Sequence, residues 1–235
     1  MDGSRAVLQN MPCTTAKELV VQIENQAALA KSSTVPVLRA IRKRVSGQIT
    51  GLDRSVIIEG ALTLITNGRV HRFVPYELVQ YHPATMEKIT WPEIEQLADG
   101  IASWSEVDSF GCSISGPAWA GERINDSKIK TWARSPNRWL RRAALVSTLA
   151  LNGQPPAEES TGRTLEICRM LVGDRDDMIV KALSWALRRL GTKDPIAARN
   201  FVDQHRAKLA SRIVREVNRK LETGRKDGRR RASEK

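Results

Sequence analysis

The chain has 235 residues, of which 41% are hydrophobic, and its 38 lysines and arginines against 26 aspartates and glutamates give a formal net charge of +12. This length suffices for one large core or one repeat array. Such an excess of positive charge favours a polyanion, nucleic acid above all, over a protein partner. No stretch approaches the roughly 20 apolar residues that a membrane span needs, so we expect no membrane association.

The first residues and the cysteines indicate in which cellular compartment we expect the protein. The opening residues lack a basic region followed by an apolar one, so we expect no secretory signal. Cys13, Cys112 and Cys168 are odd in number, far apart and without a CxxC pair. They indicate reduced thiols and no metal site. We therefore expect a cytoplasmic protein that associates with the nucleoid by binding DNA.

Apolar residues three and four positions apart predict an all-α fold, and the alternation typical of strands is absent. Asp53 is expected to begin one helix, Gly68 to end it, and Pro195 to begin another after Asp194. The pattern predicts helices over residues 15–31, 37–48, 54–66, 72–81, 93–114, 127–134, 138–150, 164–172, 177–190 and 195–222.

Many short helices with short connections predict an α-solenoid of paired helices whose basic concave face holds a duplex. We expect one such domain over residues 1–221. The chain from residue 219 onward is rich in basic residues, which include Arg229, Arg230 and Arg231, and it contains few apolar ones. Residues 222–235 are therefore expected to form a disordered basic tail, which either tethers DNA or only aids solubility.

Trp104 and Asp108 are the most informative pair in the sequence. A spacing of four places both on one face of a helix, beside an apolar direction formed by Val107, Phe110 and Ile114. An indole face and a carboxylate both attract cations. Gly111 and Ser115 on the same flank are expected to leave open space beside Asp108. The alternative interpretation is a core tryptophan beside a solvent-facing aspartate.

The helix predicted over residues 177–190 carries a second tryptophan off its apolar face. Ile179, Leu183, Ala186 and Leu190 share one face, and the wheel places Trp185 roughly 130° from its centre. Its neighbours there are Met178, Lys181 and Arg188. A tryptophan between two cations is typical of a nucleic-acid contact; otherwise it fills a second packing layer.

Arginines interrupt the apolar helix predicted over residues 138–150. Arg138 and Arg142 lie one turn apart, on the side away from Leu140 and Ala144. Arginine suits bidentate contact with phosphate, so both are candidate DNA-binding residues. A solvated basic face explains them equally well.

Three ordered segments, Trp104–Asp108, Trp139–Ala144 and Lys181–Arg188, together with Val35–Arg39, resemble the AlkD-type DNA alkylation repair family over roughly residues 15–220. Members of that family are HEAT-like helical repeats that wrap DNA, and they include glycosylases that excise N7- and N3-alkylated purines. The resemblance implies that Asp108 is the catalytic aspartate, Trp104 and Trp185 the aromatic pair, and Arg142 a DNA contact. The sequence departs from the pattern at Ser105, where many members have an acidic residue, and at Ser33 and Thr34.

The expected function is a monofunctional glycosylase that removes cationic N7- or N3-alkylated purines from duplex DNA. An alkylated purine leaves as a neutral base, so one carboxylate suffices, and no metal or cofactor is expected. The resemblance implies no base capture in a deep pocket. Expected DNA contacts are Arg138, Arg142, Lys181 and Arg188, and a monomer is expected. Two alternatives stay open: a non-catalytic DNA-structure-binding member of the fold, and a helical scaffold for protein or RNA.

Overall fold

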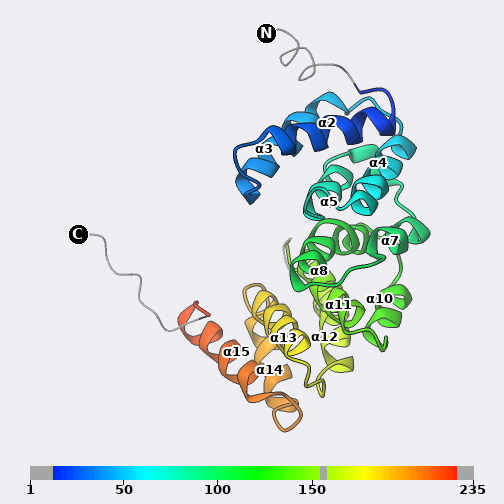
Figure 1. Cartoon of the computed structure of the whole chain (residues 1–235). Helices are drawn as coiled ribbons and strands as arrows, with labels where there is room; N and C mark the ends of the chain where they lie inside the picture. Colours follow the sequence, from blue (N-terminus) through cyan, green and yellow to red (C-terminus); the bar gives the residue numbers. More distant parts are fainter. Residues whose placement is uncertain (1–12, 154–157, 227–235) are drawn as a thin grey trace. The chain divides into compact units, whose positions relative to one another are not determined.

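The computed structural model describes residues 13–153 and 158–226, and every regular element in these two ranges is a helix. The all-α prediction is thereby confirmed. The chain divides into two units, Met1–Ile101 and Ala102–Lys235, whose helices are labelled in Figure 1. In the described ranges, no helix combines the length and the apolar character needed to cross a membrane.

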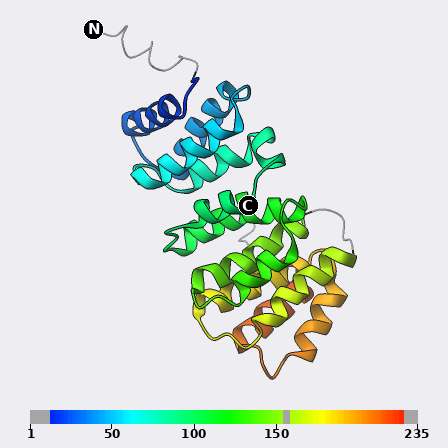
Figure 2. The same ribbon diagram turned by 90° about the vertical axis from the view of Figure 1, so that its right-hand side faces the viewer.

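The first unit is built around one central helix. α4 packs on α2, α5, α6 and α7, and Figure 2 gives a second view of these helices. As predicted, Asp53 caps the start of α4 by accepting a hydrogen bond from the Ser55 amide, and Gly68 ends it in the left-handed conformation. The helices are α2 (Ala16–Leu29), α3 (Val35–Gln48), α4 (Arg54–Asn67), α5 (Phe73–Gln80), α6 (Pro83–Glu87) and α7 (Trp91–Ala98).

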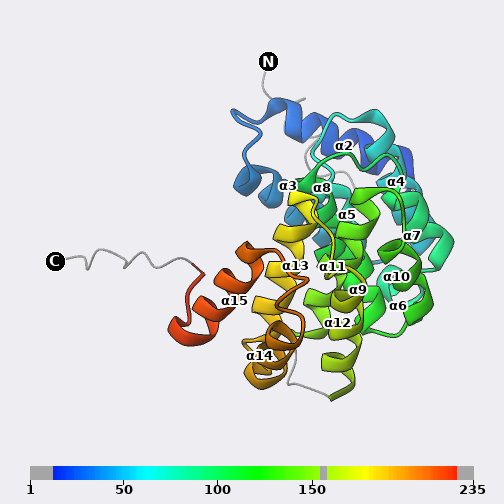
Figure 3. The same cartoon turned by 90° about the horizontal axis from the view of Figure 1, so that it is seen from below.

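The second unit is organised around α11, which packs against α8, α9, α10, α12 and α13, while α13 packs in turn against α15. Figure 3 shows α11, α13 and α15 following one another in this order. The elements are α8 (Trp104–Phe110), the π-helix η1 (Gly111–Ser115), α9 (Gly116–Ala120), α10 (Asp126–Ala133), α11 (Arg138–Leu151), α12 (Glu158–Met170), α13 (Asp177–Leu190), α14 (Pro195–Gln204) and α15 (Ser211–Thr223).

Three predicted helices are wrong in extent. The helix expected over residues 164–172 begins earlier, since it is α12 (Glu158–Met170). The helix expected over residues 93–114 is interrupted between Ala98 and Trp104, where Gly100 adopts a positive φ of 66° and Ser103 begins a new helix. The helix expected over residues 195–222 is two helices, because α14 ends at Gln204 and the backbone at Ala210 is extended.

The basic tail begins later than predicted. α15 continues through Thr223 and ends at Gly224, whose left-handed conformation satisfies the helix terminus, as glycine does readily. Residues 219–223 are therefore helical. Arg229, Arg230 and Arg231 lie outside the described residues, so the expected disorder of the tail stays a prediction.

A glycine-dependent contact sets the distance between α8 and α11. Gly111 begins η1, and a Cβ atom added there would lie 2.6 Å from Cγ1 of Val146 in α11. The hydroxyls of Ser115 and Ser147 are 2.7 Å apart in the same contact. The space expected beside Asp108 at Gly111 and Ser115 is thus filled by α11, and that prediction is wrong.

We expect Gly111→Ala to lower the free energy of unfolding by about 1–3 kcal/mol, because overpacking forces neighbouring backbone to move. Gly162→Ala is the matched control, since a Cβ atom there in α12 would meet nothing within 4 Å. It should leave stability unchanged or raise it by up to about 1 kcal/mol. Urea unfolding of both variants makes the comparison, and equal effects would contradict the packing described here.

Candidate functional site

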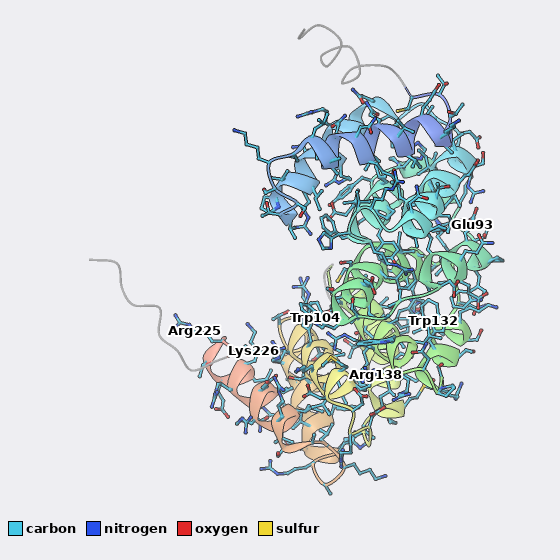
Figure 4. The ribbon with its side chains drawn as sticks, in the orientation of Figure 1. Glu93, Trp104, Trp132, Arg138, Arg225 and Lys226 are labelled. Carbon is cyan, nitrogen blue, oxygen red and sulfur yellow. The ribbon has the colours of Figure 1, made fainter. Side chains whose placement is uncertain are left out.

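A pocket of about 500 Å³ lies wholly within the second unit, between residues of α8, α11, α13 and α15 and the end of the described chain. Two tryptophans, one carboxylate and five cationic side chains dominate its lining. Figure 4 labels Trp104 and Lys226, two members of that lining. Among the described residues, the lining consists of Trp104, Asp108, Arg142, Met178, Lys181, Trp185, Arg188, Arg212 and Lys226.

Asp108 is held by a bidentate ion pair with Arg142. Nε of Arg142 donates to Oδ1 at 2.9 Å, and Nη2 donates to Oδ2 at 2.8 Å. A third bond runs from Nη1 to the carbonyl oxygen of Met178 in α13. The Asp108 side chain is 18% exposed and that of Arg142 is 6% exposed. The carboxylate therefore has a fixed orientation and one face toward the pocket.

The placement of Arg142 changes its expected role. Three bonds within the protein, together with its burial, direct the guanidinium at Asp108. The helical wheel places Arg142 on a side available to solvent, but α11 is covered by helices on several sides, so this residue is buried. A direct bidentate grip on a DNA phosphate by Arg142 would require it to give up part of this arrangement.

The two tryptophans reach the pocket from different helices. Trp104 is the first residue of α8, and it is 58% exposed. The capping box of Ser103 and Glu106 fixes the start of this helix, which satisfies amides that the helix leaves unpaired. Trp185 in α13 is half-buried. As predicted, Ile179, Leu183, Ala186 and Leu190 are buried on the apolar face of that helix.

Cations from α13 and α15 complete the lining. Lys181 pairs with Asp177 one turn earlier in α13, and this partner lowers the pKa of Asp177. Arg188 donates from Nε to the Ser184 hydroxyl at 3.2 Å. Arg212 donates from Nε to Glu216 at 2.8 Å. Because Asp108 is the only acidic residue that lines the pocket in the described part of the chain, the pocket should attract anions.

The structure brings together all but one of the residues that the sequence singled out. Asp108, Trp104, Trp185, Arg142, Lys181 and Arg188 line one pocket. Arg138 does not: it lies over the ring of Trp139, 4.6 Å from the ring centroid, and 3.6 Å from Asp176. Whether any of them contacts DNA stays a prediction.

Sequence reasoning missed Arg212 and the largely buried Glu216, and it assigned Lys226 only to the basic tail. Arg212 and Glu216 are four residues apart, a spacing that favours an ion pair on a helix. That signal is present in the sequence. The prediction of one helix over residues 195–222 hid this signal, because it did not separate α15 from α14 and so did not place α15 beside the site.

Comparison with known proteins identifies the family. A family model described as DNA alkylation repair enzyme matches residues 32–221, a span that holds every lining residue of the pocket except Lys226. Comparison with curated proteins and with solved structures gives no significant match.

A double-mutant cycle with Asp108→Ala and Arg142→Ala should give a coupling energy of about 1–3 kcal/mol, because neighbours in one buried ion pair do not act independently. The exposed pair Asp177–Lys181 should give less than about 1 kcal/mol in the same assay. Urea unfolding of the wild type and of the single and double variants supplies both values. Equal coupling in the two pairs would show that the Asp108–Arg142 pair is not preorganised.

Proposed function

Since the chain belongs to the DNA alkylation repair enzyme family, we propose that it is a monofunctional DNA glycosylase acting on cationic N7- or N3-alkylated purines in duplex DNA. The observation that carries the proposal is the Asp108 carboxylate, fixed by Arg142 in the wall of a cationic pocket that Trp104 and Trp185 also line. The carboxylate, the indoles and the cations would each have a separate role in this reaction.

The leaving group needs no proton donor. An N7-alkylated purine already carries a positive charge, and cleavage of its glycosidic bond returns the bonding electron pair to the ring, which leaves as a neutral base. The sugar then bears the positive charge. A water molecule adds at its anomeric carbon and loses one proton, so the products are free base, an abasic site and a proton. One carboxylate can stabilise the cation and accept that proton.

Asp108 has the capacity for both tasks. An ionised carboxylate has about four lone-pair sites, and the two bonds from Arg142 occupy two of them. One remaining site on each oxygen can face a sugar or a water molecule. Arg142 accordingly acts as a positioning residue in this proposal, because it fixes the carboxylate before the substrate arrives.

The indoles and the cations have complementary roles. Trp104, being exposed, can stack on deoxyribose and attract its developing charge through its ring face. The cations hold the negatively charged backbone on either side. Lys181 is engaged by Asp177, and an ammonium group in an ion pair is a poor nucleophile. Lys181 is therefore not proposed as a Schiff-base nucleophile, and the proposed reaction is hydrolysis.

The pocket also bears on how the lesion is bound. Base-flipping enzymes enclose the extruded base in a snug pocket between stacking side chains. Here one of the two indoles is more than half exposed, an arrangement suited to gripping sugar and phosphate while the base stays outside. We accordingly propose excision without capture of the base in a deep pocket.

Asp108→Asn should reduce the single-turnover rate of N7-methylguanine release by a factor on the order of 10²–10³, because the variant lacks a preorganised charge at the reacting sugar. Duplex affinity should change little. Asp203→Asn is the control, since Asp203 is an exposed residue of α14 outside the pocket. The measurement is base release under single-turnover conditions, with duplex affinity recorded for each protein.

Two outcomes would contradict the proposal. If Asp108→Asn releases N7-methylguanine at the wild-type rate, the carboxylate is not the catalytic group. If the wild type binds duplex DNA with a steep salt dependence but releases no base, the protein is a non-catalytic DNA-binding member of its family. A flat salt dependence would instead favour a scaffold for other partners.

A further inference from the structure

Glu216 occupies a position behind the pocket that the proposed reaction does not use. It lies in α15 with a side chain that is 12% exposed, and it is absent from the pocket lining. Its carboxylate oxygens accept hydrogen bonds from the Ser184 hydroxyl at 2.6 Å and from Nε of Arg212 at 2.8 Å. Nε of Arg188 lies 3.8 Å from Oε2.

We propose that Glu216 is a positioning residue that holds Arg188 and Arg212 as a clamp for a DNA phosphate beside the Trp104–Trp185 site. This inference rests on the proposed function, because it assumes that the ligand of the pocket is DNA. It names the part of that ligand, a phosphodiester group, that the α13–α15 wall binds.

The chemistry of the cluster favours an anion at this wall. Arg188 and Arg212 both approach the largely buried carboxylate of Glu216, and both line the pocket. Burial raises the pKa of Glu216. The hydrogen bonds from Ser184 and Arg212 and the charges of Arg212 and Lys226 lower this pKa by more than burial raises it, so it lies below the ordinary value. The carboxylate is therefore ionised at neutral pH.

The geometry leaves donors of Arg212 available to a ligand. Its Nε is engaged by Glu216, and its Nη1 is 3.4 Å from Asp177. Among the described residues, Nη2 has no hydrogen-bond partner. The side chain is 36% exposed, against 14% for Arg188. Guanidinium groups whose inner edge is fixed by a carboxylate present their outer edge in the fork geometry that phosphate accepts.

The simpler explanation is that Glu216 only fastens α15 to α13. The two explanations predict opposite effects of removing its charge. If Glu216 were only a fastener, neutralising it would make the pocket more positive and should strengthen binding to DNA. If it positions the clamp, binding should weaken although the protein becomes more positive.

The test compares Glu216→Gln with Glu222→Gln in the full chain. Glu222 is an exposed residue of the same helix, so both variants lose one negative charge from α15. The probe is duplex DNA with a tetrahydrofuran abasic-site analogue, which requires no turnover. Affinity is measured over a range of salt concentrations, and thermal unfolding is recorded for each protein.

We expect Glu216→Gln to bind the probe about tenfold more weakly than Glu222→Gln, since a hydrogen bond to a charged group contributes about that factor. The slope of log affinity against log salt should become shallower by about one for each phosphate that the variant no longer binds. Binding equal to or tighter than that of Glu222→Gln, with an unchanged slope, would overturn the proposal.

Arg212→Gln keeps the inference testable if Glu216→Gln fails to fold, because Arg212 is partly exposed and its removal leaves Glu216 with Ser184 and Arg188. Its salt slope should be shallower by about one, and an unchanged slope would overturn the proposal. Failure of the wild type to release N7-methylguanine would overturn the proposed function, while these affinities would still decide whether the clamp exists.

Discussion

The bidentate pair of Asp108 and Arg142 is the interaction on which the rest of the site depends. It joins α8 to α11, and the third bond of Arg142 reaches the carbonyl of Met178 in α13. Such a pair requires that α8 and α11 lie close together, and Gly111 permits this, because any side chain there would meet Val146. A π-helical segment begins at this glycine. π-Helical segments are rare in proteins, and those that occur often lie at functional sites. Packing, backbone irregularity and the orientation of one carboxylate are thus parts of a single arrangement.

The charge of the pocket explains why one carboxylate among five cations suits the proposed chemistry. DNA is a polyanion, so in the proposed function the cations attract its backbone to the pocket. In the proposed reaction the sugar becomes positive only as the base departs, and among the described lining residues Asp108 alone has a charge that favours that change. Arg142 weakens the negative field of Asp108 but keeps its orientation fixed. Preorganised groups stabilise a transition state better than mobile ones, because no reorganisation is required when the charge develops.

The sequence predicted the features that depend on local periodicity. It did not predict the features that depend on contacts between helices far apart in the chain. The face of Trp104 and Asp108, and the apolar stripe of α13 with Trp185 beside it, follow from a repeat of 3.6 residues. The pairing of Asp108 with Arg142 joins residues 34 positions apart, and no periodic pattern encodes it. Gly111 and Ser115 suggested open space because small residues look the same whether they leave a gap or admit a neighbour. The separate α15 was missed because residues 205–210 contain neither glycine nor proline.

In the proposed reaction, one fixed carboxylate suffices because the substrate supplies its own positive charge. The most direct measurement compares single-turnover base release from two duplexes of the same sequence, one with N7-methylguanine and one with hypoxanthine, a purine lesion that is uncharged and must be protonated to leave easily. We expect release of N7-methylguanine and no detectable release of hypoxanthine, since no general acid is proposed in the pocket. Comparable rates for the two bases would contradict it, because the protein would then have to provide a proton donor for the leaving group.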